Sequence, residues 1–275
     1  MNRLTQRSYY YLVAALPELA LQQAELPFGL KEWIGVLEKN GTPADLQQLT
    51  LLRLPADHRH IIAWLYDGHD APDDTINYYS GEELRSKLEE GRGLPAYLHE
   101  VYDGFRQKKE QPERLVFEQE LTEKYYDYAL PKARGVVQEW LSFDRNLRNL
   151  LSAWNRRKHH LPSEHQVVGQ NDITRAIQQN AQARDFGLGK AYPRWYWWVH
   201  EAESDGLLEQ QQNLNRIRWN FLNEVLRFEY FSFDVLLGYF LKLQILESRV
   251  GPDARRGQER LDNYIEQIAE QFSLL

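Results

Sequence analysis

The chain has 275 residues, of which 43% are hydrophobic and 13% aromatic, so it can form a large packed core and is unlike a disordered protein. It contains no cysteine, which excludes disulfides and cysteine-based zinc or iron–sulfur sites. Its net charge of −7 argues against a dedicated nucleic-acid binder, and no stretch approaches the roughly 20 apolar residues that span a bilayer.

The N-terminal segment, MNRLTQRSYYYLVAALPELAL, superficially resembles a secretory signal peptide, because two arginines precede a short apolar run. Three consecutive tyrosines, the acid at Glu18 and the lack of a small-residue cleavage motif argue against that interpretation. We therefore expect this segment to belong to the folded domain of a soluble, cytoplasmic protein.

Apolar residues recur at intervals of three, four and seven along most of the chain, which is the period of helices with one buried face. No run alternates strictly between apolar and polar residues, as a surface strand would. The sequence therefore predicts an all-α protein. The expected helices, in chain order, are 9–15, a second short helix after the turn that follows it near 17–19, 31–39, 44–54, 58–66, 82–90, 95–106, 113–130, a central helix from 131 that frays at 156–160, 172–183, 194–203, 208–230, 231–250 and 255–272.

Several residues are expected to begin or end these helices. Gly41 is predicted to end helix 31–39 in a left-handed conformation, and Asp57 to cap helix 58–66. Ser80, with Glu83 three residues later, fits a capping box before helix 82–90. Pro131 suits either the first turn of the central helix or a kink between it and the preceding helix.

The triplet Ser-Phe-Asp occurs at 142–144 and again at 232–234, each time in an apolar helical context. Aligning Asp144 with Asp234 leaves a fainter match upstream at Asp57, so the spacing is about 90 residues. We therefore expect three pseudo-repeated helical bundles in a funnel-like or triangular body. The expected units are 1–70, a degenerate copy completed by the C-terminal helix, then 71–160, then 161–275, which includes that helix.

The segment around Asp144 contains an acid, an Asn-Leu pair, further apolar residues and a basic end. These residues are Asp144, Asn146-Leu147, Asn149-Leu150-Leu151 and Arg156-Arg157-Lys158. The segment thereby resembles the signature of the C-type (in eukaryotes d-type) subunit of V-type ATPases, an all-α family of three related helical bundles. The preceding EKYYDYALPKAR and the N-terminal YYLVAA are also similar to the family, whereas Asp57 and Asp234 lack the Asn-Leu pair. The chain is most similar to short bacterial members that accompany V-type ATPase subunits.

This resemblance implies a mechanical function. Members of the family sit on the membrane rotor ring and receive the end of the central stalk, so the chain would be a non-catalytic connector without a cofactor. Its partners would be the central-stalk subunits and the rotor ring. It would lie in the cytoplasm, peripheral to the inner membrane, with no transmembrane segment and no nucleic-acid partner.

Two groups of residues are candidates for binding a partner. Four consecutive aromatic residues, including Trp195, Trp197 and Trp198, cover most of a helix circumference, so at least one should face a groove, a partner or a membrane interface. Core packing would explain the others. The basic residues Arg156, Arg157 and Lys158 would contact anionic lipid or an acidic partner, or would complement the helix C-terminus.

The acids on apolar stripes have two interpretations. Asp144 and Asp234 are either interface acids or buried acids that cap a helix or pair with a nearby arginine, with Arg148 and Arg227 as the local partners.

An enzyme or ligand-binding protein is the alternative function, with a site built from scattered acids, histidines and the aromatic segment 195–198. No Glu-x-x-His or His-x-x-x-His pair occurs, so we expect no metal site. The chain also has no Gly-rich phosphate loop and no Gly-x-Ser-x-Gly motif.

Overall fold

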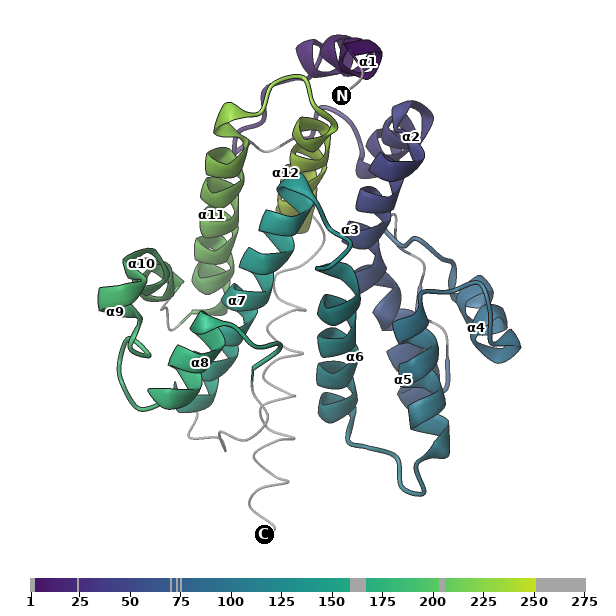
Figure 1. The fold of residues 1–275 in the computed structure, drawn as a ribbon, viewed down its shortest axis with the longest axis vertical. Coiled ribbons are helices and arrows are strands. Elements are labelled where there is room, and N and C mark those ends of the chain that lie inside the picture. The colour runs from purple at the N-terminus through teal and green to yellow at the C-terminus, as the bar shows by residue number, and fades with distance from the viewer. Residues whose placement is uncertain are drawn as a thin grey trace.

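The computed structural model of the protein describes residues 3–23, 25–69, 71–72, 74, 76–158, 167–202 and 206–250. This part of the chain is all-helical and contains no strand, as the sequence predicts (Figure 1). The expected helix 255–272 lies outside the described residues. The elements are α1 (Arg3–Ala14), α2 (Leu30–Asn40), α3 (Pro43–Ile62), the π-helical turn η1 (Ala63–Asp67), α4 (Gly81–Glu90), α5 (Ala96–Gln107), α6 (Arg114–Ala129), α7 (Gly135–Lys158), α8 (Asp172–Gln179), α9 (Leu188–Ala191), α10 (Pro193–Ala202), α11 (Leu207–Val225), the 3₁₀ turn η2 (Leu226–Phe228) and α12 (Phe233–Val250).

Three helices of at least 18 residues, α3, α7 and α12, begin at the same end of the molecule (Figure 1), and we call these three the long helices. The side chain of Gln48 near the start of α3 donates to the carbonyl of Lys132 and accepts from the amide of Arg134, just before α7. At the start of α12, the Phe233 ring packs on Tyr9 of α1 with 5.3 Å between ring centroids, and the Tyr9 hydroxyl donates to Asp45 at the start of α3 at 2.6 Å. These contacts fix the starts of the three helices relative to one another.

Each long helix packs against at least two other helices. Helix α3 packs against α4 and α6, whereas α7 packs against α8 and α11. Helix α12 packs against α2, α7 and α11. Helix α5 lies on α6, and α10 lies on α11. None of the helices in the described residues combines the length and hydrophobicity that crossing a bilayer requires.

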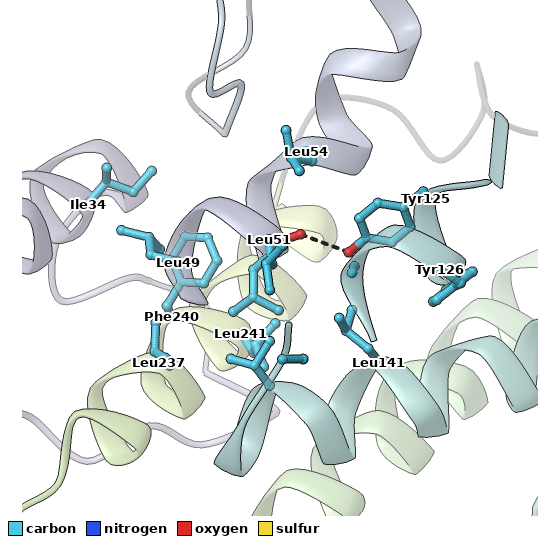
Figure 2. Packing of buried hydrophobic residues seen from close by; sticks show 14 of the residues in the cluster. Ile34, Leu49, Leu51, Leu54, Tyr125, Tyr126, Leu141, Leu237, Phe240 and Leu241 are labelled. Carbon is cyan, nitrogen blue, oxygen red and sulfur yellow. Dashed lines mark hydrogen bonds between the residues drawn. The ribbon is translucent and has the colours of Figure 1, made fainter. Parts of the chain in front are cut away.

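Helix α7 contributes to all three hydrophobic clusters of the described residues. Its first turns join the main core, which extends over α2 to α6 and α12 (Figure 2). Its middle joins a second cluster with α10 and α11, and its C-terminal half joins a third with α8 and α9. The buried α7 residues in these clusters are Val136, Val137, Leu141, Phe143, Leu147, Leu150 and Ala153. The apolar face of α7 therefore connects the three hydrophobic clusters.

The predicted break between helices 44–54 and 58–66 is wrong, because α3 runs continuously through Pro55. A proline inside a helix lacks the N–H that would bond to the carbonyl four residues earlier, here that of Leu51. The hydroxyl of Tyr125 on α6 donates to that carbonyl at 2.8 Å and replaces the missing donor (Figure 2). Asp57 is therefore not an N-cap but lies inside the helix.

The described residues 16–23 and 25–29 contain no helix, so the second short helix predicted there is wrong. Two other helix ends also differ from the prediction. Gly41 has φ of −75°, so it ends α2 in an extended and not a left-handed conformation. Pro131 lies in the turn between α6 and α7, and α7 begins at Gly135. By contrast, Ser80 caps α4 as predicted, because its side chain accepts from the amide of Glu83.

The start of α7 is held by an acid from α12. Asp234 accepts a hydrogen bond of 3.3 Å from the amide of Val136, an N-terminal donor that has no partner within its own helix. Gly135 has φ of +53°, and a Cβ there would lie 2.0 Å from the Asp234 Oδ2. Burial raises the pKa of Asp234, and the nearby Glu229 and Asp45 raise it further, whereas the bond from Val136 lowers it.

We predict that Tyr125→Phe lowers the free energy of unfolding by about 1–3 kcal/mol, because the buried Leu51 carbonyl loses the donor that replaces the missing proline N–H. Tyr128→Phe is the control, since it removes a hydroxyl from a half-buried position on the same helix and should change stability little. Urea unfolding of both variants measures the difference. Equal stabilities for the two variants would show that the Tyr125 hydroxyl does not compensate for the missing N–H of Pro55.

We predict that Gly135→Ala lowers the free energy of unfolding by about 3 kcal/mol or more. A residue with a side chain is strained at this positive φ, which costs about 1–3 kcal/mol, and its Cβ would also clash with Asp234. Gly35→Ala, in the middle of α2 with no atom within 4 Å of the new Cβ, should instead stabilise the protein by about 0.5–1 kcal/mol. Thermal or urea unfolding compares them, and a neutral Gly135→Ala would show that Asp234 does not fix the start of α7.

Candidate interaction surface

The aromatic segment 195–198 divides between the interior and the surface. Trp195 and Trp198 lie three residues apart on α10, so they share one face of that helix. Both pack on Phe143 of α7, with ring centroids 5.7 Å and 5.2 Å away. Trp197 points elsewhere and is 63% exposed. Of the three predicted partner-binding tryptophans, only Trp197 is therefore largely available to a partner.

The basic end of α7 is partly used inside the protein. Arg157 donates to the carbonyl of Ala183 at 2.6 Å and to that of Arg184 at 3.2 Å, and it lies over the Phe186 ring. Lys158 lies over the ring of Trp154, with 5.0 Å between its Nζ and the ring centroid. Arg156 is half-buried. Arg157 thus holds the segment that follows α8, a role that neither sequence interpretation foresaw.

Asp144 connects three helices. Its carboxylate accepts from the Tyr126 hydroxyl of α6 at 2.9 Å and from Arg218 of α11 at 3.3 Å. The Asp144–Arg218 pair is largely shielded from solvent, with 18% and 22% of the two side chains exposed. The expected pairing with Arg148, one turn further along α7, is therefore replaced by a partner on another helix. Asp144 is an internal acid and not an exposed interface acid.

Asp57 holds the chain segment that leads into α4. It is fully buried, and its Oδ1 accepts from Asn77 Nδ2 and from the amides of Tyr78 and Tyr79. One turn earlier on α3, Arg53 donates to the carbonyls of Ile76 and Asn77. Arg53 and Asp57 together bind donors and acceptors of the same segment, and we call this pair the α3 clamp.

Asn149 makes a similar contact from α7. It is buried, accepts from the amide of Val168 at 2.8 Å and donates to its carbonyl at 3.0 Å. Asn146, on the same helix, accepts from Asn171, the N-cap of α8. We call Asn146 and Asn149 the α7 clamp. Each clamp fixes the chain shortly before the short helix that follows its long helix.

The three aspartates of the sequence alignment therefore occupy different positions. Asp57 lies in the second half of α3, Asp144 near the middle of α7, and Asp234 is the second residue of α12. By its contacts, Asp57 corresponds to Asn149 and not to Asp144. The alignment on Ser-Phe-Asp could not reveal this, because an acid and an amide perform the same function at the two positions.

His58 lies beside the α3 clamp and is enclosed. Its Nε2 is 2.8 Å from the Tyr97 hydroxyl, and its ring packs against Tyr125. Burial lowers the His58 pKa to about 3, with a smaller contribution from Arg148, so the ring is neutral at physiological pH. In the described part of the chain, no three His, Asp or Glu side chains are arranged to hold a metal ion.

Five exposed aromatic residues lie on α1 and on the connection from α11 to α12. These two segments are at the end of the molecule where α3, α7 and α12 begin (Figure 1). We call this group the aromatic end, and its residues are Tyr10, Tyr11, Phe228, Tyr230 and Phe231. The rings of Tyr10 and Phe231 are 4.4 Å apart, which joins α1 to the connection between α11 and α12. Phe228 is 79% exposed and Tyr11 77%.

Sequence reasoning missed the aromatic end, because it assigned 228–231 to two adjoining helices. The actual connection turns through η2, and Phe231 takes a left-handed φ of +53°. Such a conformation is uncommon for a residue with a side chain. The available signal was the Phe-Glu-Tyr-Phe run itself, which has too many aromatic residues for one helix face.

The comparison with protein families is positive over almost the entire chain. The family model described as "Protein of unknown function (DUF2764)" matches residues 6–272. The chain belongs to the DUF2764 family. No curated protein and no solved structure matches it. The matched residues include both clamps and the aromatic end.

We predict that Asp57→Asn in this DUF2764 protein changes how stability depends on pH. Burial raises the Asp57 pKa from 3.8 to about 6, although the bonds from Asn77 and the two amides lower it. A raised acid pKa means that the folded state binds the proton more tightly, so the wild type loses stability as the pH rises from about 4 to about 6. Asparagine at position 57 would keep an Oδ1 acceptor for the three hydrogen bonds, and Asn149 already provides such an acceptor in the α7 clamp.

The difference in unfolding free energy, variant minus wild type, should therefore increase between pH 4 and pH 7 by up to about 3 kcal/mol. Urea unfolding across that pH range measures it, with Asp103→Asn at an exposed position of α5 as the control. Parallel pH profiles for Asp57→Asn and wild type would show that Asp57 does not have a raised pKa.

Proposed function

We propose that this DUF2764 protein is a non-catalytic connector in the central stalk of a V-type ATPase, which couples the soluble stalk to the membrane rotor ring. The resemblance of residues 144–158 to the C-type subunit suggests the complex. The observation that carries the proposal is that α3, α7 and α12 begin together at one end, and that this end carries five of the exposed aromatic residues.

The two clamps support the expectation of related helical bundles, because buried Asp57 of α3 and Asn149 of α7 each hold the segment that leads into the next short helix. The long helices also pack across the expected boundaries between units, since α3 packs against α6, α7 against α11 and α12 against α2. The C-terminal helix that would complete the first unit lies outside the described residues.

A connector that transmits torque must resist shear between its helices. Close packing provides that resistance in general, since protein interiors have low compressibility. Here, directional bonds between helices add to it: Asp144 joins α7 to α6 and α11, Asp234 joins α12 to α7, and the indole of Trp33 on α2 donates to the carbonyl of Leu236 on α12.

The aromatic end is the surface that we assign to a stalk partner. Tyrosine is enriched among residues that dominate binding energy at interfaces, and large exposed aromatic groups gain most when a partner covers them. Two of its residues, Phe228 and Tyr230, have 79% and 67% of their surface exposed. The protein would work in the cytoplasm, peripheral to the inner membrane, without a cofactor.

Affinity isolation of the tagged protein from native membranes tests the proposal. We expect the catalytic and central-stalk subunits of the V-type ATPase to co-purify with the wild type. Phe228→Ala/Tyr230→Ala should reduce their recovery at least about 30-fold, since the two interface residues would together contribute about 2 kcal/mol or more.

Leu115→Ala/Val116→Ala is the matched control, because it truncates two exposed apolar side chains on α6 and should leave recovery unchanged. Absence of ATPase subunits from the wild-type preparation would refute the proposed function. Co-purification that the aromatic variant does not reduce would retain the function but exclude the aromatic end as the binding surface.

A further inference from the structure

The charge of the chain is unevenly distributed. Residues 145–200 contain nine of the 33 Lys and Arg but only three of the 40 Asp and Glu. This segment therefore has a formal net charge of +6, whereas the rest of the chain has −13. An acidic protein thus carries one strongly basic segment, and such an asymmetry favours binding of that segment to an anionic surface.

The basic segment is also a unit in space. The C-terminal half of α7 packs with α8, α9 and the turn before α9 around its own apolar cluster, and α10 packs against α9 (Figure 1). The buried residues of that cluster are Leu150, Ala153, Ile173, Ile177, Phe186 and Leu188. We call the described residues 145–158 and 167–200 the basic lobe.

Some cations of the basic lobe are engaged and others are available. Arg175 pairs with Asp172, and Arg194 pairs with Glu224 of α11. Arg184 and Lys190 are exposed, and neither has an ion-pair partner among the described residues. Both belong to the turn and short helix 184–191, in which Asp185 accepts from the amides of Gly187 and Gly189. The two available cations are therefore displayed on a well-defined turn.

An exposed tryptophan lies next to this turn. A Cβ on Gly189 would lie 3.9 Å from the ring of Tyr196, so α10 contacts the residue preceding Lys190. Trp197 follows Tyr196, and 63% of its surface is exposed. Tryptophan and tyrosine beside cations are typical of protein segments that lie at the boundary between lipid and water.

We propose that the basic lobe docks on an anionic phospholipid surface, with Arg184 and Lys190 near the headgroups and Trp197 at the interface. The two cations and the indole are spread over a turn and a helix, a pattern that suits a planar array of charges better than one bound anion. The acidic remainder of the chain opposes close approach, so the docking is oriented with the basic lobe toward the membrane. This inference does not depend on the proposed role in the ATPase.

Co-sedimentation of the full chain with vesicles tests the docking. One set of vesicles contains phosphatidylcholine alone, and the other an equal mixture of phosphatidylcholine and phosphatidylglycerol. We expect the protein to bind only the mixed vesicles, and to lose binding at high salt because the attraction is screened over roughly 10 Å or less. Trp197→Ala should weaken binding to the mixed vesicles several-fold.

Two charge-reversal variants distinguish the effect of charges in the basic lobe from the effect of the net charge of the protein. Arg184→Glu/Lys190→Glu should lower the partition into mixed vesicles at least tenfold, since each cation near an anionic membrane contributes about 1 kcal/mol. Lys31→Glu/Lys39→Glu changes the net charge equally, at exposed positions of α2, and should retain most of the binding. Circular dichroism and thermal unfolding confirm that both variants fold.

Three results would overturn the proposal. The first is no binding of the wild type to mixed vesicles at low salt. The second is an equal loss for both charge-reversal variants. The third is binding to polyglutamate without binding to vesicles, which would assign the basic lobe to an acidic protein. Because the assay uses the isolated protein and lipid only, its failure leaves the proposed role in the stalk untouched, and the converse also holds.

Discussion

Helix α7 is the constraint on which the remainder of the structure depends. Its 24 residues pass through all three hydrophobic clusters, so the surrounding helices are placed by the face of α7 that they cover. Its start is set by the Asp234 carboxylate, which leaves room only for glycine at position 135. A helix fixed at its start and buried along its length gives the molecule one axis, against which α11 and α12 pack directly.

Buried polar groups then decide how the remaining segments are arranged. Hydrophobic burial is non-directional, so it does not determine which connecting segment packs against which helix. The two clamps provide that information, because Asp57 and Asn149 each bind backbone groups of a specific segment. A buried acid is costly unless it is hydrogen-bonded, and all three bonds of Asp57 converge on one oxygen. The second oxygen can therefore carry a proton without loss of these bonds.

Much of the secondary structure could be predicted from the sequence, since helical periodicity and the Ser80 cap are local signals. The features that escaped prediction depend on partners far along the chain. Pro55 does not break α3 because Tyr125, separated by 74 residues from the carbonyl that it binds, provides a donor. Asp144 is also 74 residues from Arg218. The local pattern instead indicates Arg148, which follows Asp144 by one helical turn. The aromatic residues 228–231 were assigned to helices because the turn is set by packing against α1, which a local pattern does not contain.

We propose that this helical body occupies the central axis of a rotary ATPase as a connector. Electron cryomicroscopy of the V-type ATPase isolated from native membranes tests this proposal most directly. We expect density for α3, α7 and α12 on the rotor axis, between the stalk shaft and the membrane ring, with the aromatic end covered by a stalk protein. An intact, active ATPase in which that position is filled by another protein, with no density for this chain, would contradict it.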